Sequence, residues 1–282
     1  MEVPAGVRVL LNGLDLTDRV AGPGYTVREL EGWWEPTAST GSVVQRAGAP
    51  GGWLDEAHPM GRRLVARGSI DSGSHTESAA MLDALWRALP VDGRVPLVVV
   101  EDGVASHVMV RQEDKPDITW VTETYVTFDF QLHSREWRRL AGDGSGPSRS
   151  VTVGLPFTQG GRRRPLVLPS RFDAVVVSGS VEVVNTGSAS PPVVVTFTGP
   201  VSRPAVRSAV SGRAQWFDLD VLPGQSLVVD QDARSVRLNG VSRRGAMRGD
   251  WLAPVPGDSF VFDAGSYDEA ARMTVSWSDA WR

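Results

Sequence analysis

Three pairs of neighbouring carboxylates are the residues of this chain best suited to acid–base chemistry. The pairs are Asp218 with Asp220, Asp230 with Asp232, and Glu101 with Asp102. A glycoside hydrolase needs two carboxylates that face each other across a sugar, roughly 5–10 Å apart. Asp230 and Asp232 instead fall in the expected turn of a hairpin, where aspartate is favoured because its side chain accepts hydrogen bonds from its own backbone. We therefore interpret this pair as a turn, and a calcium loop is disfavoured because the EF-hand spacing is absent.

The other catalytic residue types show no spacing that predicts an active site. The 4 histidines are His58, His75, His107 and His133, without the HxH or HExxH spacing of a metal site. The chain has 0 cysteines, which excludes disulfides, thiolate metal sites and cysteine nucleophiles. No GxSxG elbow accompanies the serines, although folding could still assemble a Ser-His-Asp triad. We expect no enzymatic activity, no cofactor and no metal, and keep a glycan-cleaving enzyme as the remaining hypothesis.

Tryptophan is abundant, with 10 in 282 residues. Exposed tryptophans stack on sugar rings or anchor subunit contacts. Three are expected in the core: Trp86, Trp216 and Trp277. The candidates for subunit contacts are Trp33, Trp34 and Trp53. The candidates for glycan contacts are Trp251, Asp230 and Asp232.

The charge balance argues against a nucleic-acid partner. The chain carries 29 Lys and Arg against 33 Asp and Glu, a formal net charge of -4, whereas nucleic-acid binding depends on neutralising phosphates. One basic cluster, Arg162 to Arg164, could hold a phosphate or a sulfated sugar. In so acidic a chain, a solvated loop or a contact to an acidic neighbouring surface is the preferred interpretation. We expect no specific nucleic-acid binding.

A membrane segment is not expected either. The longest apolar runs, such as Pro96 to Val100, are far shorter than the ~18 residues that span a bilayer. Residues Met1 to Gly6 lack the basic and apolar regions of a secretory signal. These features predict no membrane insertion and assembly in a cytoplasm.

Residues 1–145 predict an α+β domain, a sheet with one helix on it. Asn12-Gly13 between two apolar runs predicts a hairpin. Alternating apolar residues from Trp120 to His133 predict a strand with one buried face. Further strands are expected at 62–70, 95–101 and 105–111, with a turn at Glu101-Asp102-Gly103 between the last two. The Gly/Pro-rich stretch from Ala21 to Pro59, which includes the Gly/Pro/Trp-rich segment 32–59, is expected to form loops that pack against something, because it is too apolar for a free linker.

One convincing helix is expected in the chain. Ser74 and Glu77 have the spacing of a capping box, and Pro90 is the stop signal. Between them, apolar residues recur at steps of three and four, at Ala79, Leu82, Leu85, Trp86 and Leu89. This stripe predicts the helix face that packs on the sheet.

Residues 146–282 predict an all-β domain after a Gly/Ser-rich linker at 141–148. Short β-branched runs alternate with turn signals such as Asn185-Thr186-Gly187, Pro223-Gly224 and Asn239-Gly240. A spacing of about 8–12 residues between turns is typical of an antiparallel β-sandwich. Such a fold presents loops and edges, so a binding or assembly module is expected.

Taken together, the motifs of both halves resemble the distal tail proteins of long-tailed, non-contractile bacteriophages, the siphovirus-type or minor tail proteins. In the first half the resemblance lies in Val9 to Leu16, in Arg62 to Ile70, in Leu82 to Leu89 and in Pro96 to Asp102. In the second half it lies in these stretches: Val184 to Gly187, Pro191 to Thr198, Leu227 to Asp230, Val236 to Gly240, Gly249 to Leu252 and Pro256-Gly257. The order and spacing of these stretches, which cover nearly the whole chain, carry the resemblance.

The resemblance implies a mainly β protein with an N-terminal ring-forming belt domain and a C-terminal galectin-like β-sandwich. It implies a homo-oligomer, usually a hexameric ring, that connects the tail tube to the tip or baseplate proteins and leaves a channel for DNA. The tape measure protein is a further implied partner, and the virion tail tip is the implied location. The long segment 32–59 departs from many family members. The alternative hypothesis is a carbohydrate-binding module for host surface glycans.

Overall fold

The chain forms two compact units, each with its own hydrophobic core. The structure, a computed structural model, describes residues 1–18, 22–159, 175–266 and 268–282, so the cluster Arg162 to Arg164 lies outside the described residues. Unit 1 comprises Met1–Gly146 and Trp281–Arg282, and unit 2 comprises Pro147–Ala280. Among the described residues, no helix has the length and apolar character needed to cross a membrane.

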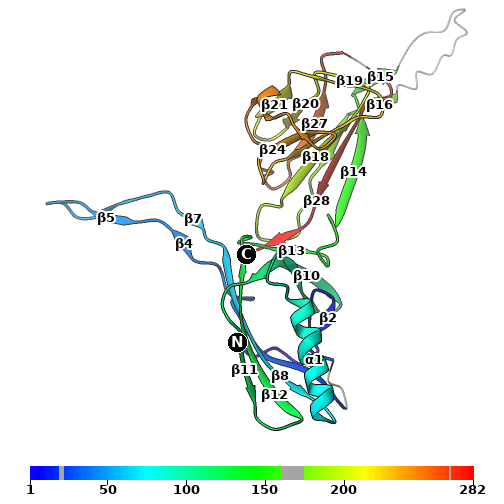
Figure 1. The fold of residues 1–282 in the computed structure, drawn as a ribbon. Coiled ribbons are helices and arrows are strands. Elements are labelled where there is room, and N and C mark those ends of the chain that lie inside the picture. The colour runs from blue at the N-terminus through cyan, green and yellow to red at the C-terminus, as the bar shows by residue number, and fades with distance from the viewer. Residues whose placement is uncertain (19–21, 160–174, 267) are drawn as a thin grey trace, which may run out of the picture. The chain divides into compact units, whose positions relative to one another are not determined.

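Unit 1 is built on one antiparallel sheet with the strand order β2-β1-β9-β10-β12-β8-β3, in which β11 also pairs with β12 and β13 with β10 (Figure 1). Its strands are β1 (Arg8–Leu11), β2 (Leu14–Asp15), β3 (Gly24–Glu31), β8 (Arg62–Asp71), β9 (Val95–Glu101), β10 (Val104–Gln112), β11 (Asp117–Trp120), β12 (Tyr125–Ser134) and β13 (Arg139–Ala141). Leu16 donates to the Val9 carbonyl of β1 (2.8 Å) and accepts from Val27 of β3 (2.9 Å). The two ends of the sheet therefore approach each other, and the sheet curls around its core.

Two tight hairpins of unit 1 form where the sequence predicts them. Asn12 and Gly13 join β1 to β2 with φ of 50° and 84°, and Asp102 and Gly103 join β9 to β10 with φ of 49° and 80°. A two-residue hairpin turn whose twist matches that of its strands needs positive φ at both central positions. Asn-Gly and Asp-Gly adopt these angles with little backbone strain.

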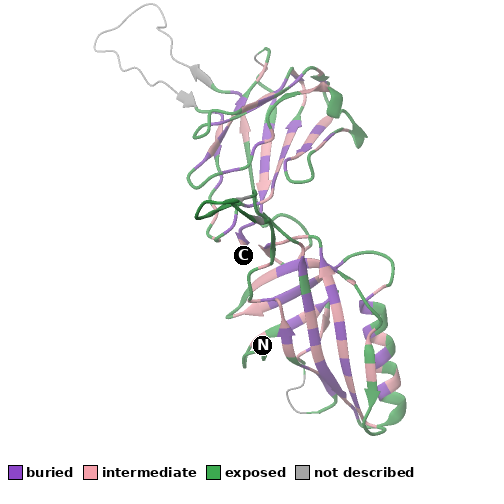
Figure 2. Cartoon of the chain, turned by 90° about the vertical axis from the view of Figure 1, so that its left-hand side faces the viewer, coloured by how far each residue is buried: buried purple, intermediate pink, exposed green. Residues whose placement is uncertain are grey.

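Alternation along β12 sets the buried face of the sheet. Val126, Phe128, Phe130 and Leu132 are all buried, and the bands along the strands in Figure 2 show the same alternation. Phe128 and Phe130 stack with ring centroids 4.9 Å apart. Gly68, the register partner of Phe128, permits this packing, because a Cβ there would lie 2.5 Å from the Phe128 ring and 2.3 Å from the Thr26 carbonyl oxygen. The predicted strand begins later than expected, at Tyr125, because β11 precedes it as a separate strand.

The expectation that the whole Gly/Pro-rich stretch from Ala21 to Pro59 forms loops is wrong. Residues 24–31 form β3, which pairs with β8 along its length with a bulge between Val27 and Glu29. Glu29 and Glu31 both bind the Arg67 guanidinium of β8, at 2.9 and 2.6 Å. The strand depends on a partner about 40 residues away, so local propensity alone does not reveal it.

Helix α1 (His75–Ala88) covers the sheet of unit 1 (Figure 1). The Ser74 hydroxyl accepts from the Glu77 amide (3.3 Å), while the Glu77 carboxylate accepts from the Gly73 amide (2.7 Å), one residue before the cap. Its buried residues are Ser78, Leu82, Leu85 and Ala88. Trp86 is 37% exposed, so its expected place in the core is wrong: it lies at the border of the stripe and meets Phe130 edge-on at 6.0 Å.

Unit 2 is a sandwich of two antiparallel sheets with the orders β14-β28-β18-β23-β24-β25 and β17-β27-β20-β21-β26. The first sheet contains β14 (Arg149–Gly154), β18 (Val193–Thr198), β23 (Ser226–Asp230), β24 (Ser235–Leu238), β25 (Val241–Ser242) and β28 (Arg272–Trp277). The second contains β17 (Ser180–Glu182), β20 (Ala205–Ser208), β21 (Ala214–Phe217), β26 (Met247–Gly249) and β27 (Ser259–Asp263). The shorter elements of unit 2 are β15 (Phe157–Gln159), β16 (Val175–Val177), β19 (Val201–Ser202), β22 (Asp220–Val221) and η1 (Arg244–Ala246). The boundary between the two units falls within β29 (Ala280–Trp281).

An aromatic cluster joins the two sheets of unit 2. Phe197 of β18 lies 5.8 Å from Phe217 of β21 and 5.6 Å from Phe262 of β27, measured between ring centroids. Trp277 is buried as expected, and its Nε1 donates to the Val184 carbonyl at 2.8 Å. Trp216 is 41% exposed, so the expectation that it packs in the core is wrong, because the alternation of β21 buries Gln215 and Phe217 instead.

His107 is a buried titratable group on β10. It is 5% exposed, and its Nδ1 lies 3.0 Å from the Gly142 carbonyl oxygen. Burial lowers the pKa of His107, and the hydrogen bond to Gly142 only partly offsets this effect. The folded state therefore resists protonation of this imidazole.

We predict that Leu85→Ala lowers the free energy of unfolding by roughly 2–5 kcal/mol, because it removes a fully buried side chain between α1 and the sheet. Urea denaturation followed by far-UV circular dichroism measures this change. The matched control is Asp83→Ala on the exposed face of α1, with an expected cost under about 0.5 kcal/mol. Equal costs for the two variants would mean that the helix face is assigned wrongly.

We also predict that acid weakens the fold through His107. Its folded-state pKa is lowered, so the unfolded state binds more protons once the pH falls below about 6.5, and the free energy of unfolding decreases there. His107→Gln should lose less stability than the unmodified chain between about pH 7 and pH 5. Calorimetric unfolding at a series of pH values tests this, and parallel curves for the two proteins would contradict it.

Candidate functional site

The segment between β3 and β8 leaves the body of unit 1 as a two-stranded ribbon (Figure 1). We call residues 36–60 the arm. Its strands are β4 (Ser39–Thr40), β5 (Val43–Gln45), β6 (Gly52–Leu54) and β7 (His58–Pro59), and they pair β4 with β7 and β5 with β6. The Met60 amide donates to the Ala38 carbonyl at the base (2.8 Å), and the Arg46 amide donates to the Gly51 carbonyl near the tip (3.2 Å). The expected loops of segment 32–59 are thus a β-hairpin in the structure.

The arm carries exposed apolar side chains near its tip. Trp53 is 64% exposed and Val44, its register partner on β5, is 55% exposed. The Arg46 guanidinium lies 4.4 Å from the centre of the Trp53 ring. The expectation that segment 32–59 packs against something is met at its start, where Trp33 and Trp34 pack on the core of unit 1. Within the described part of the chain it is not met at the tip, where the arm pairs with itself. An exposed tryptophan on an isolated ribbon is a surface suited to a second molecule.

Trp33 and Trp34 lie at the start of the segment and have different surroundings. Trp33 is 0% exposed and belongs to the core of unit 1, so its ring is covered by its own chain. Trp34 is half-buried, and its Nε1 donates to the Glu101 carboxylate at 2.6 Å. Of the three tryptophans proposed for subunit contacts, the structure leaves Trp53 most accessible.

One buried arginine fastens the base of the arm. Arg62 is 1% exposed, and its Nη1 donates to the carbonyls of Gly32, Trp33 (3.1 Å) and Glu35 (2.8 Å). Its Nη2 donates to the Trp137 carbonyl at 3.2 Å. Burial, and then the neighbouring Arg139 charge, lower the pKa of Arg62 to about 10, so the side chain stays cationic at neutral pH. Sequence reasoning places Arg62 in a strand but gives no sign of this role.

In unit 2 the structure places the two aspartates of the hairpin close to the segment that holds Trp251. Asp230 Oδ1 accepts from the amides of Asp232 (3.0 Å) and Ala233 (2.8 Å), which is the turn predicted from the sequence. Between them, buried Gln231 accepts from the Leu252 amide (3.0 Å). The Arg244 guanidinium lies 5.6 Å from the centre of the Trp251 ring. These contacts engage Asp230 and the Trp251 ring within the chain, and glycan contact by Trp251, Asp230 and Asp232 stays a prediction.

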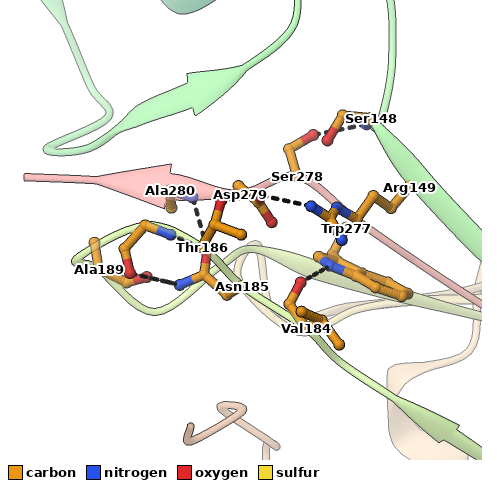
Figure 3. Close-up of polar contacts among 11 residues, drawn as sticks. Ser148, Arg149, Val184, Asn185, Thr186, Ala189, Trp277, Ser278, Asp279 and Ala280 are labelled. Atoms are coloured by element: carbon orange, nitrogen blue, oxygen red, sulfur yellow. Dashed lines mark hydrogen bonds and ion pairs between the residues drawn. The ribbon is translucent and has the colours of Figure 1, made fainter. Parts of the chain in front are cut away.

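A cavity of about 530 Å³ opens beside the turn that follows β17. It is lined by residues 182–185 and 187–191 of one segment and by residues 254–257 of another. Asn185 shapes the first segment: its Oδ1 accepts from the amides of Gly187 (3.2 Å) and Ala280 (3.0 Å), and its Nδ2 donates to the Ala189 carbonyl (2.7 Å). Figure 3 shows this network.

Asp279 extends the same network. Its carboxylate, 6% exposed, accepts from Arg149 (2.9 Å) and from the Thr186 hydroxyl (2.5 Å), as Figure 3 also shows. An Asn-Thr-Gly turn signal is visible in the sequence, but its tie to residues near 280 is not. Within the described ranges, no group of three His, Asp or Glu side chains could hold a metal ion.

We predict that Arg62→Met destabilises unit 1 by at least about 2 kcal/mol, because several backbone carbonyls lose a cationic donor. Hydrogen exchange of the full chain, analysed for peptides of β3, β8 and the arm, measures this effect. Arg63→Met is the matched control, since Arg63 is the exposed neighbour that pairs with Glu113 at 3.3 Å and should contribute at most about 1 kcal/mol. If the control opens these peptides as much as Arg62→Met does, the anchoring role is wrong.

Part of the chain matches a known protein family, and the whole chain is similar in fold to solved structures. Residues 186–281 match the family model described as the siphovirus-type tail component, C-terminal domain. The chain is similar to the crystal structure of SPP1 Dit, described as a paradigm of the hub adsorption apparatus in phages infecting Gram-positive bacteria. That match has a TM-score of 0.65 and 15% identity, and covers 98% of this chain and 99% of that one. None of the curated proteins compared matches the chain.

A second likeness is to chains of the phage P2 baseplate in its activated conformation. With Ca the TM-score is 0.51, and with Sr it is 0.50, each at 10% identity and covering 95% of this chain and 96% of that one. The predicted fold class is confirmed: mainly β, with an α+β first domain and a galectin-like antiparallel sandwich after it. Residues 186–281 match the C-terminal domain of the siphovirus-type tail component, and the resemblance of the chain to the distal tail proteins of long-tailed bacteriophages is confirmed.

Proposed function

We propose that this chain is a structural protein of a bacteriophage tail tip that assembles as a ring, with six copies as the expected number. The observation that carries this proposal is the likeness to SPP1 Dit over 98% of this chain and 99% of that one. A likeness that spans both units supports a shared architecture, beyond the tail-component domain matched at residues 186–281. The role is scaffolding rather than catalysis.

The arm supplies the contact between neighbouring copies in this proposal. A two-stranded ribbon has two open edges, and an exposed ribbon is marginal in water unless it packs on another surface. Trp53 and Val44 present apolar area at its end, while Arg62 holds its base to the core of unit 1. A ring closes such head-to-tail contacts, because each copy offers an arm to the next and receives one from the copy before.

The ring joins the tail tube to the tip or baseplate proteins and leaves a channel for DNA, with the tape measure protein as a further partner. The likeness to chains of a phage baseplate supports a place in such an assembly. The protein is then a component of the virion, assembled in the cytoplasm of the host. A net charge of -4 agrees with a channel protein that lets DNA pass without holding it.

Light scattering of the purified chain over a concentration series tests the ring. We expect the mass of six copies of the 30.4 kDa chain, and a ring in negative-stain images. Trp53→Ser should shift the equilibrium to smaller species by at least about tenfold in concentration, because exposed aromatic anchors carry much of the binding energy of interfaces.

The matched control is Trp216→Ser, which removes another exposed tryptophan from β21 of unit 2. It should leave the ring intact, and circular dichroism should show both variants folded. A monomer at every concentration, with no ring in images of the phage particle, would contradict the proposed function. A ring that Trp53→Ser does not weaken would leave the function but reject the arm contact.

A further inference from the structure

Unit 1 has a cavity of about 370 Å³ whose side chains are all basic. It is lined by Gly61, Arg94, Arg111, His133 and Arg135, and we call it the basic cavity. The lining residues come from four places in the chain: the residue before β8, the residue before β9, the end of β10 and the end of β12. Arg111 and His133 are register partners on β10 and β12. The fold therefore gathers these cationic groups from distant parts of the sequence.

The arginines of the basic cavity lack protein partners. In the described part of the chain, the side chains of Arg94, Arg111 and Arg135 form no ion pair or hydrogen bond, and no acidic residue lines the cavity. The nearby carboxylate of Glu113 binds Arg63 instead, at 3.3 Å. By contrast, Arg67 on the same sheet binds three carboxylates, those of Glu29, Glu31 and Asp129. Like charges gathered without a counter-charge repel one another, so an anion in the cavity would relieve a cost that the fold otherwise carries.

The backbone leaves room for this arrangement at Gly61. A Cβ at residue 61 would lie 3.1 Å from His133 Nε2 and 2.6 Å from the Ser134 carbonyl oxygen. No positive φ requires glycine at this position, so the reason for glycine is the close approach of the Ser134 carbonyl oxygen, beside which the His133 imidazole also lies. Gly61 and His133 therefore lie next to each other in the wall of the cavity.

We propose that the basic cavity binds a phosphate group. A guanidinium presents a planar fork of donors that matches phosphate oxygens two at a time, and three such forks suit an anion that carries more than one charge and several acceptor oxygens. A carboxylate has two oxygens and a single charge, and would leave donors of this set unused. The proposal concerns a ligand of unit 1 and does not depend on ring assembly.

Isothermal titration of the full chain with pyrophosphate at low ionic strength tests the proposal. We expect one site per chain, and binding at least about tenfold weaker for Arg111→Gln and for Arg94→Gln, since each variant removes one charge-assisted contact. The chain has only 4 histidines, so the His133 ring protons can be assigned in proton NMR by comparison with His133→Gln. Pyrophosphate should shift the His133 signals and leave those of buried His107 unchanged.

Arg87→Gln is the charge-matched control, because Arg87 is exposed on α1 and does not line the cavity. Its affinity for pyrophosphate should equal that of the unmodified chain. Equal weakening by the control, or no binding of pyrophosphate, would overturn the proposal. A second titration with a DNA duplex present identifies the source of the phosphate: competition assigns it to nucleic acid, and unchanged binding assigns it to a small phosphate-bearing molecule.

Discussion

The constraint on which unit 1 depends is the buried charge of Arg62. Its side chain is buried, and both of its Nη groups donate to main-chain carbonyls, those of Trp33 and Glu35 before the arm and that of Trp137, rather than to a carboxylate. Removing one of these carbonyl partners from the buried cation would cost free energy of folding. The backbone before and after the arm is therefore constrained to a course that keeps these carbonyls at the guanidinium. The start of the arm, its end and the segment after β12 are thereby held at one point.

Because each unit closes its own core, the arm needs to contribute nothing to folding of the body. Its side chains are free to serve another molecule, and the ribbon carries only enough internal pairing to hold its shape. The charged side chains of unit 1 also divide into those that pair within the fold and those that do not. Acidic groups on the outer surface of β3 and β12 gather on Arg67, while the arginines around His133 are left without counter-charge. Surface groups that the fold does not use are the ones available for assembly and ligands.

Local patterns account for the parts of the fold that were predicted correctly. Alternation marks β12, Asn12-Gly13 marks a hairpin, and the Ser74 cap with its apolar stripe marks α1. What local patterns miss depends on partners far away in the chain. Strand β3 exists because β8 pairs with it, and Arg62 finds its acceptors 29 and 75 residues away at Trp33 and Trp137. For the same reason, residue type alone could not separate buried Trp33 from exposed Trp53.

The division of the chain makes unit 2 an insertion within unit 1, because Trp281 and Arg282 count with the first unit. During synthesis, unit 1 can gather its final residues only after the whole of unit 2 has been made, although each core can condense on its own. The Arg139 side chain lies 5.7 Å from the Trp33 ring centre and donates to the Arg282 carbonyl at 3.3 Å. The second of these contacts can form only after residue 282 has been made. A graft that exchanges unit 2 between related proteins must therefore be spliced at two junctions, and a fragment cut at Gly146 would omit part of the unit it was meant to isolate.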